Sequence, residues 1–236
     1  MERSNRFRLW LPSALALLLF AVFAPTPASA DTFTLNIDHC TGGCGNAPFG
    51  TIQLTQGADN STVHVDISLN DGNQLVHTGL EGSTIAFNID SDPTITLNNV
   101  SLPGWTLDSN SAGSIHFDGF GYFDYSINCC FNQNGSINAQ TGAVSFDLTN
   151  SDPGGTLHPS DFYELSTGGD DSVYFGVDIL SSATGNTGPV GDGGGCPTCS
   201  SISSVPEPGT LVLLGSGLSG LALWSRKRRN SPNAQM

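Results

Sequence analysis

Strict alternation of apolar and polar residues is the feature that most constrains how this chain can fold. Over residues 62–69, Val63, Val65, Ile67 and Leu69 share one parity, while the polar residues take the other. A period of two over such a length is typical of a β-strand with one buried face. The alternation recurs over residues 85–89, 123–127, 144–148 and 173–179, and shorter runs cover 33–37, 51–56, 94–100 and 114–117.

Turn-forming residues separate these runs, and no window between the two ends of the chain sustains a helical period. Clusters rich in Asn, Asp, Gly and Pro occupy residues 70–73, 90–93, 134–135, 152–155 and 168–171. About ten short strands, each with one apolar face, predict an all-β fold. The expected architecture is an antiparallel, jelly-roll-like β-sandwich over residues 31–180.

Charge is distributed very unevenly along the chain, because all seven Lys and Arg residues lie at its two ends. Of the 21 carboxylates, only Glu2 and Glu207 lie outside residues 31–204, so that stretch has a formal charge of −19. A body without Lys or Arg cannot neutralise phosphates, and its field repels polyanions. This charge excludes nucleic acid as a partner.

The N-terminus has the three parts of a secretory signal peptide, which is predicted over residues 1–30. Three arginines precede an apolar run over residues 9–24, and Ala28 and Ala30 provide the small residues of a signal peptidase site. The alternative is an uncleaved anchor helix, against which the prolines and the modest apolar length argue. We therefore predict cleavage before Asp31 and an exported mature chain.

The C-terminal end combines a Pro-Glu-Pro triplet, an apolar run containing several glycines, and a basic cluster. The triplet and its neighbours are Val205, Pro206, Glu207, Pro208 and Gly209, and the cluster is Arg226, Lys227, Arg228 and Arg229. In this order and spacing, residues 205–229 resemble the PEP-CTERM sorting domain of Gram-negative bacteria that make exopolysaccharide. The resemblance implies that an exosortase, an integral-membrane cysteine transpeptidase, recognises the triplet and processes the tail.

The apolar run is consistent with a transient anchor in the inner membrane. The 16 residues 209–224 would form a helix of about 24 Å, slightly short of the roughly 30 Å hydrocarbon core. The basic cluster predicts that residues 230–236 are a cytoplasmic tail and that the body lies on the far side, bound for the cell surface or matrix. A plain tail anchor would share the run and the charges but would not need the Pro-Glu-Pro triplet.

Six cysteines lie in the mature region, and their even number in an exported chain predicts disulfides. Cys129 and Cys130 are adjacent, so we expect them to pair with two different partners, for which Cys40 and Cys44 are candidates. The remaining two, Cys196 and Cys199, have the spacing of a redox motif. They lie in a Gly- and Ser-rich stretch over residues 181–204 that is predicted to be a flexible linker, which favours an inert local disulfide there.

Calcium is the one cofactor that the sequence suggests. Asp90, Asp92, Asp170 and Asp171 lie in predicted loops, where their carboxylate oxygens are candidate ligands for a hard cation. Aspartates also favour turns because they hydrogen-bond their own backbone, and this alternative is the preferred interpretation. No metal is therefore assigned.

Three classes of function compete for the body of the chain. A structural or interaction protein of the cell surface or biofilm matrix, without catalysis, is the leading prediction, since the Gly-x-Ser-x-Gly and helical His motifs are absent. The alternative is an exopolysaccharide-binding module, with Trp105 in a predicted loop as a candidate sugar-stacking residue. The aromatic cluster Phe117, Phe120, Tyr122, Phe123 and Tyr125 is assigned mostly to the core. A secreted hydrolase has no positive support.

Overall fold

The computed structural model describes residues 30–78, 83–108, 113–130 and 138–194, which form fourteen strands and one 3-10 helix. The elements are β1 (Ala30–Asp38), β2 (Gly50–Gln56), β3 (Thr62–Leu69), β4 (Gln74–Leu75), β5 (Ile85–Phe87), β6 (Ile95–Asn98), β7 (Thr106–Asp108), β8 (Ile115–Phe117), β9 (Gly121–Phe123), β10 (Tyr125–Asn128), β11 (Ala143–Asn150), η1 (Pro159–Phe162), β12 (Thr167–Gly168), β13 (Phe175–Leu180) and β14 (Thr187–Asp192). Neighbouring strands pair antiparallel, for example β3 with β11 and β13 with β14. The predicted all-β, antiparallel fold is confirmed.

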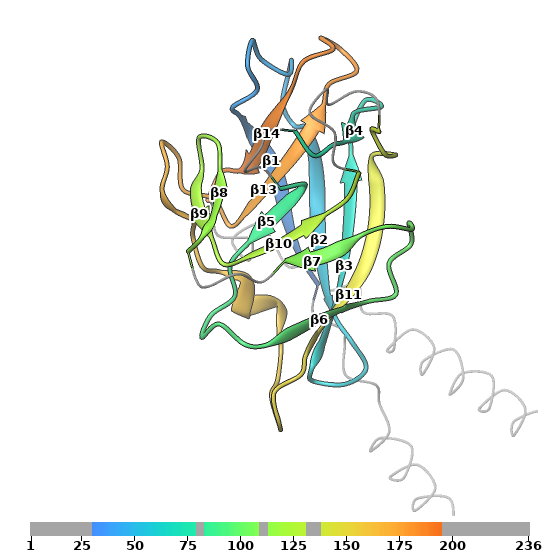
Figure 1. The fold of residues 1–236 in the computed structure, drawn as a ribbon, viewed down its shortest axis with the longest axis vertical. Helices are drawn as coiled ribbons and strands as arrows, with labels where there is room; N and C mark the ends of the chain where they lie inside the picture. The colour runs from blue at the N-terminus through green and yellow to red at the C-terminus, as the bar shows by residue number, and fades with distance from the viewer. Residues whose placement is uncertain (1–29, 79–82, 109–112, 131–137, 195–236) are drawn as a thin grey trace, which may run out of the picture. The chain divides into compact units, whose positions relative to one another are not determined.

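Eleven of these strands form one continuous sheet in the order β6-β11-β3-β2-β1-β14-β13-β5-β10-β7, with β4 attached to β13. Figure 1 shows β5, β10 and β7 crossing in front of β2, β3 and β11, so the sheet curls over itself. Its two edge strands, β6 and β7, come close to one another. The fold is therefore nearly closed and barrel-like, where the sequence suggested a sandwich of separate sheets.

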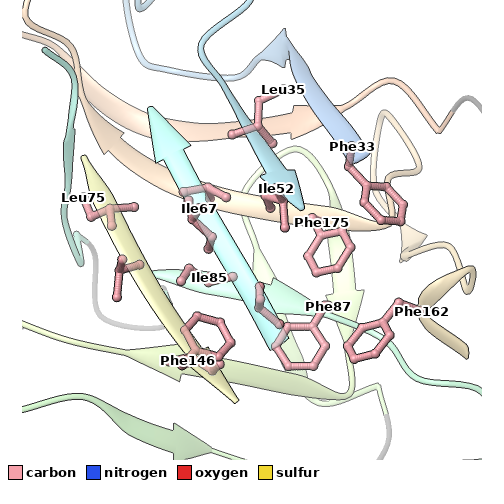
Figure 2. Packing of buried hydrophobic residues seen from close by; sticks show 14 of the residues in the cluster. Phe33, Leu35, Ile52, Ile67, Leu75, Ile85, Phe87, Phe146, Phe162 and Phe175 are labelled. Atoms are coloured by element: carbon pink, nitrogen blue, oxygen red, sulfur yellow. The ribbon is translucent and has the colours of Figure 1, made fainter. Parts of the chain in front are cut away.

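The main core fills the inside of this curl. Phe87, Phe162 and Phe175 gather there with ring centroids 5.7–6.1 Å apart, and Figure 2 shows them beside residues from several strands. The alternation seen in the sequence explains the packing, because Val63, Val65 and Ile67 of β3 are each no more than 2% exposed. Burial of this apolar surface is the main favourable contribution to folding.

A second, three-stranded sheet, in the order β12-β9-β8, covers part of the outer face of the large sheet. A separate apolar cluster lies between this sheet and the large one, and it consists of Ala86, Ile115, Phe117, Phe120, Phe123 and Val173. The contact is close: a Cβ added to Gly176 of β13 would lie 2.8 Å from the ring of Phe117. Both faces of β13 are thus covered, although its sequence alternates like that of a half-exposed strand.

The prediction of a flexible linker over residues 181–204 is wrong for its first half, because residues 187–192 form strand β14. This strand lies in the middle of the large sheet, between β1 and β13. Its glycines are required by close approach: a Cβ on Gly188 would lie 2.6 Å from Cys40 Cα, and one on Gly191 would lie 2.7 Å from the Phe120 ring. Glycine in a strand can mark such tight packing, so the Gly-rich composition concealed a central strand. The folded domain consequently extends past residue 180.

The alternating segment over residues 123–127 does not form one strand either. Phe123 ends β9 in the small sheet, and Tyr125 begins β10 in the large sheet. Asp124, between them, donates its backbone N–H to Asn88 Oδ1 at 2.8 Å, in place of a bond between strands. The chain thereby passes from one sheet to the other within a single residue.

Candidate functional site

A cavity of about 180 Å³ lies where β13 and β14 approach the turn between β8 and β9. The strands contribute Asp178 and Pro189, the hairpin contributes Phe117 and Asp118, and Thr78 and Ser83 complete this part of the wall. The cavity is smaller and more polar than a pocket for a drug-sized molecule, so it can hold only a small polar group.

Asp178 is the most unusual residue on the cavity wall, since it is only 3% exposed. Strand alternation explains its position: Val177 and Ile179 point into the main core, so Asp178 points to the opposite face, beneath the small sheet. Its Oδ2 accepts hydrogen bonds from Thr78 N and Thr78 Oγ1, both at 2.6 Å. Its Oδ1 is buried and has no hydrogen-bond partner within the described part of the chain.

Burial raises the pKa of Asp178 to about 7, although the two hydrogen bonds from Thr78 act in the opposite direction. The cause is the loss of water around the charged form, which a buried carboxylate regains only from donors or cations. Residues 31–204 contain no Lys or Arg that could supply that charge. The carboxyl group of Asp178 therefore changes its charge near neutral pH.

His39 forms another part of the cavity wall and is held from three sides. Its Nε2 lies 2.9 Å from Asp171 Oδ2, and its ring meets Phe120 edge-on with centroids 4.8 Å apart. Gly119, at φ +79°, lets the backbone pass beneath the ring, because a Cβ there would lie 2.4 Å from it. The imidazole is therefore fixed in place at the edge of the cavity.

Asp192 at the end of β14 has similar chemistry in a different setting. It is 2% exposed, and its Oδ1 accepts the backbone N–H groups of Tyr174 and Phe175 at 2.9 and 2.8 Å. Its Oδ2 also lacks a hydrogen bond among the described residues. Burial raises the pKa of Asp192 to about 6, opposed by nearby backbone N–H groups, with those of Phe175 and Tyr174 first. Unlike Asp178, Asp192 is not part of the cavity wall.

The four candidate calcium ligands lie in two separate loops. Asp90 and Asp92 are exposed, and their charges, together with that of Asp124, contribute to a raised pKa of Glu164, for which burial is the largest cause. Asp171 is engaged with His39, while Asp170 donates its backbone N–H to Gly119 O at 2.8 Å. Neither pair belongs to a compact ligand group in the described ranges, and the calcium hypothesis stays a prediction.

The only compact group of potential metal ligands in those ranges is Asp38, Cys40 and Cys44. Cys40 and Cys44 are joined in a disulfide, and the Asp38 carboxylate accepts the backbone N–H groups of both at 2.8 and 2.7 Å. These bonds close a loop and leave no free thiolate for a metal.

The expected disulfide connectivity is wrong for four of the six cysteines. Cys129 is bonded to its neighbour Cys130, and Cys40 to Cys44, so each pair is local. Their adjacency predicted that Cys129 and Cys130 pair with two different partners. Instead the two neighbours are bonded to each other, and the backbone at Cys130 has φ +49°. Cys196 and Cys199 lie outside the described residues.

Trp105 is not the exposed aromatic that the sequence suggested. It is 8% exposed and belongs to the main core, because Gly104 at φ +82° turns the chain inward just before it. In the predicted aromatic cluster, the four members other than Tyr122 are indeed buried. Tyr122 of β9 is 44% exposed instead.

Tyr122 lies at the centre of a row of side chains on the outer face of the small sheet. It pairs with His116 of β8 on one side and with Thr167 of β12 on the other. The rings of Tyr122 and His116 meet at 60° with centroids 5.1 Å apart. The opposite face of the same strands is anchored by Phe117 and Phe123 in the second core, so the row rests on a packed base.

Sequence reasoning missed Asp178, His39 and Tyr122 as candidate site residues. The alternation over residues 173–179 places Asp178 on the polar face of its strand, and His39 belongs to no catalytic or metal-binding motif. The available signal was the number of aromatic residues over 117–125, which exceeds what one buried strand face requires. That excess indicates a second apolar layer, and a second layer would bury the polar face of the strand carrying Asp178.

Comparison with known proteins identifies the C-terminal segment. Residues 204–229 match the family model of the PEP-CTERM protein-sorting motif, as the Pro-Glu-Pro triplet predicted. The chain thus carries a PEP-CTERM protein-sorting motif over that segment, which indicates export, sorting through the membrane and processing by an exosortase. No curated protein and no solved structure matches the chain.

The sorting residues Val205–Gly209 and the basic cluster 226–229 lie outside the described residues, as does Ala28 of the predicted cleavage site. Ala30 is the first residue of β1, at the predicted boundary of the mature domain. Within the described ranges no helix is both long and apolar enough to cross a membrane.

Proposed function

We propose that the exported β domain is a non-catalytic interaction protein of the cell surface or extracellular matrix, and that its partner is a neutral polysaccharide. The observation that carries this proposal is the exposed Tyr122 in the row with His116 and Thr167. An aromatic ring offers an apolar face to the C–H face of a sugar, and the flanking imidazole and hydroxyl offer hydrogen bonds to sugar hydroxyls.

The charge of the domain supports a neutral partner. A body with 19 carboxylates and no Lys or Arg repels acidic polysaccharides as it repels nucleic acid. Neutral glycans avoid that repulsion and contribute only stacking and hydrogen bonding. The sorting motif supports the location, because it is typical of exported proteins that are sorted through the membrane.

Affinity electrophoresis of the exported protein in gels containing dextran, mannan or xylan tests this function. We expect retardation in at least one gel, and a loss of up to about tenfold in affinity for Tyr122→Ala, equivalent to about 1.4 kcal/mol. Leu165→Ala is the matched control, since Leu165 is the other exposed large apolar residue in the described ranges, at 38%. Equal mobility of Tyr122→Ala and wild type in every retarding gel would contradict the proposal, as would a complete lack of retardation.

A further inference from the structure

The cavity beside β13 contains an acceptor that the protein itself does not satisfy. Asp178 Oδ1 is buried and unpartnered among the described residues, while Oδ2 is already saturated by two donors from Thr78. An unsatisfied buried carboxylate oxygen costs free energy that is recovered when a donor reaches it. Asp178 forms part of the cavity wall, so a ligand in the cavity lies beside this carboxyl group, and a small shift of the wall would bring the ligand's donor to Oδ1.

The charges around the cavity determine which ligands fit. Asp118 is a second carboxylate on the wall, and the whole stretch 31–204 lacks Lys and Arg. His39 is the only group on the wall that can become cationic, and its Nε2 is already paired with Asp171. An anionic ligand would therefore meet repulsion without compensation, and a cationic donor would be attracted.

We infer that this cavity binds a primary ammonium group, held by a charge-assisted hydrogen bond to Asp178 Oδ1. An ammonium carries three donors, and the hydroxyls of Thr78 and Ser83 and the carboxylate of Asp118 provide further oxygen acceptors on the wall. Hydrogen bonds between ionised partners are about twice as strong as neutral ones. A ligand hydroxyl would satisfy Oδ1 but leave the buried negative charge uncompensated.

A bare metal ion fits the cavity less well than an ammonium group. Calcium takes six to eight oxygen ligands that converge at short distance. In the described ranges, Asp178, Asp118 and His39 do not form a compact group of metal ligands. An organic ammonium needs only one close carboxylate and some surrounding acceptors.

Free amines, amino sugars and lysine side chains share this chemistry, so the probes separate these sources. Isothermal titration of the exported protein with ethanolamine, glucosamine and Nα-acetyl-lysine amide identifies which one enters. Ethylene glycol and glucose are the neutral counterparts of the first two. Tetramethylammonium chloride, which has no N–H donor, measures non-specific attraction to the acidic surface, and calcium chloride tests the metal.

We expect at least one primary ammonium probe to bind tenfold more tightly than its neutral counterpart and than tetramethylammonium. Asp178→Asn keeps the volume but removes the charge, and we expect it to lose that binding at least tenfold. Asp192→Asn is the matched control, because it removes the other buried carboxylate, which is not on the cavity wall. Binding by Asp192→Asn should equal that of wild type.

A second measurement keeps the inference testable if Asp178→Asn does not fold. In wild-type protein labelled with ¹³C at aspartate, ethanolamine should shift the carboxyl resonance of Asp178 and leave that of Asp192 in place. Equal binding of ethanolamine and ethylene glycol, selective binding of calcium, or full binding by Asp178→Asn would each overturn the inference. These results are independent of polysaccharide binding, for which Tyr122→Ala is the diagnostic variant.

Discussion

Asp178 and Asp192 are two buried aspartates on neighbouring strands of one sheet, and they differ mainly in what lies in front of them. Each has one oxygen satisfied by two donors and one oxygen without a partner in the described chain. Asp192 shares its face with Leu35 and Val190, inside the main core, whereas Asp178 faces the small sheet and the cavity. Burial alone therefore does not identify a binding residue.

The hydrogen-bond donors to these two carboxyl groups also differ in kind. Asp192 is held by backbone N–H groups, which are fixed wherever the strands are formed, while Asp178 is held by the N–H and hydroxyl of one residue, Thr78. The first arrangement is part of the fold itself. The second depends on a side chain and a segment next to a cavity, so it can respond to a ligand.

The largest expected difference between the two sites is in the pH dependence of stability. The pKa of Asp178 rises from 3.8 to about 7 on folding, so between these values the folded protein keeps a proton that the unfolded chain has released. The free energy of unfolding therefore falls as pH rises from about 4 to 7 and is level above that. At about 1.4 kcal/mol per pKa unit, this contribution amounts to as much as about 4 kcal/mol.

Asp178→Asn should abolish this contribution, which urea denaturation at pH 4 to 8 can measure. The curve for Asp178→Asn should be flatter than that of wild type by up to about 4 kcal/mol over this range. An amide in this place leaves a buried donor that costs about 1–3 kcal/mol, so the slope is the diagnostic quantity. An unchanged slope would show that Asp178 is ionised in the folded protein throughout.

Asp192→Asn should have the same kind of effect on the pH dependence of stability as Asp178→Asn, but a smaller one. Because the pKa of Asp192 rises only to about 6, its contribution is lost between about pH 4 and 6 and is level above that. We expect Asp192→Asn to reduce the change in the free energy of unfolding between pH 4 and pH 6 by about 3 kcal/mol or less, and to leave the curve above pH 6 parallel to that of wild type. If Asp192→Asn flattened the curve up to pH 7 and Asp178→Asn did not, the contrast between the two sites would be reversed.

How far the sequence predicts this fold depends on whether a strand has one covered face or two. Alternation correctly predicted β3, whose outward residues His64 and Asp66 are partly or fully exposed. The same rule failed for β13 because a second sheet covers its outer face, which depends on contacts distant in the chain. It failed for β14 because glycines that pack against Phe120 and Cys40 resemble those of a linker.

The sites were less predictable than the strands. The sorting motif is a local pattern and was read from adjacent residues. The cavity instead combines Thr78, Phe117 and Asp178, which are 100 residues apart at the extremes and share no motif. Trp105 and Tyr122 exchanged their expected places because exposure depends on the direction of each turn, and Gly104 directs the indole inward.

The smallest expected effect concerns the hydrogen-bond donors to Asp178. It tests whether the ionised form of Asp178 is stabilised by the side chain of Thr78. Thr78→Val removes the Oγ1 donor at 2.6 Å but keeps the backbone N–H and the side-chain shape. The ionised form of Asp178 loses more than the neutral form does, so its pKa should rise further and stability at pH 8 should fall by about 1.5–3 kcal/mol.

At pH 4 Thr78→Val should lose less stability than at pH 8, since the neutral carboxyl group of Asp178 gains less from the Thr78 hydroxyl than the ionised one does. Urea denaturation at both pH values measures this difference. Thr96→Val is the control, because Thr96 is exposed and its hydroxyl bonds to Thr149 O and Asn98 instead of to a buried carboxylate. An exchange that removes only a hydroxyl cannot remove the backbone N–H donors of Asp192. An equal loss at pH 4 and pH 8 would show that Thr78 acts on packing alone, and that the two aspartates are held by the same kind of interaction.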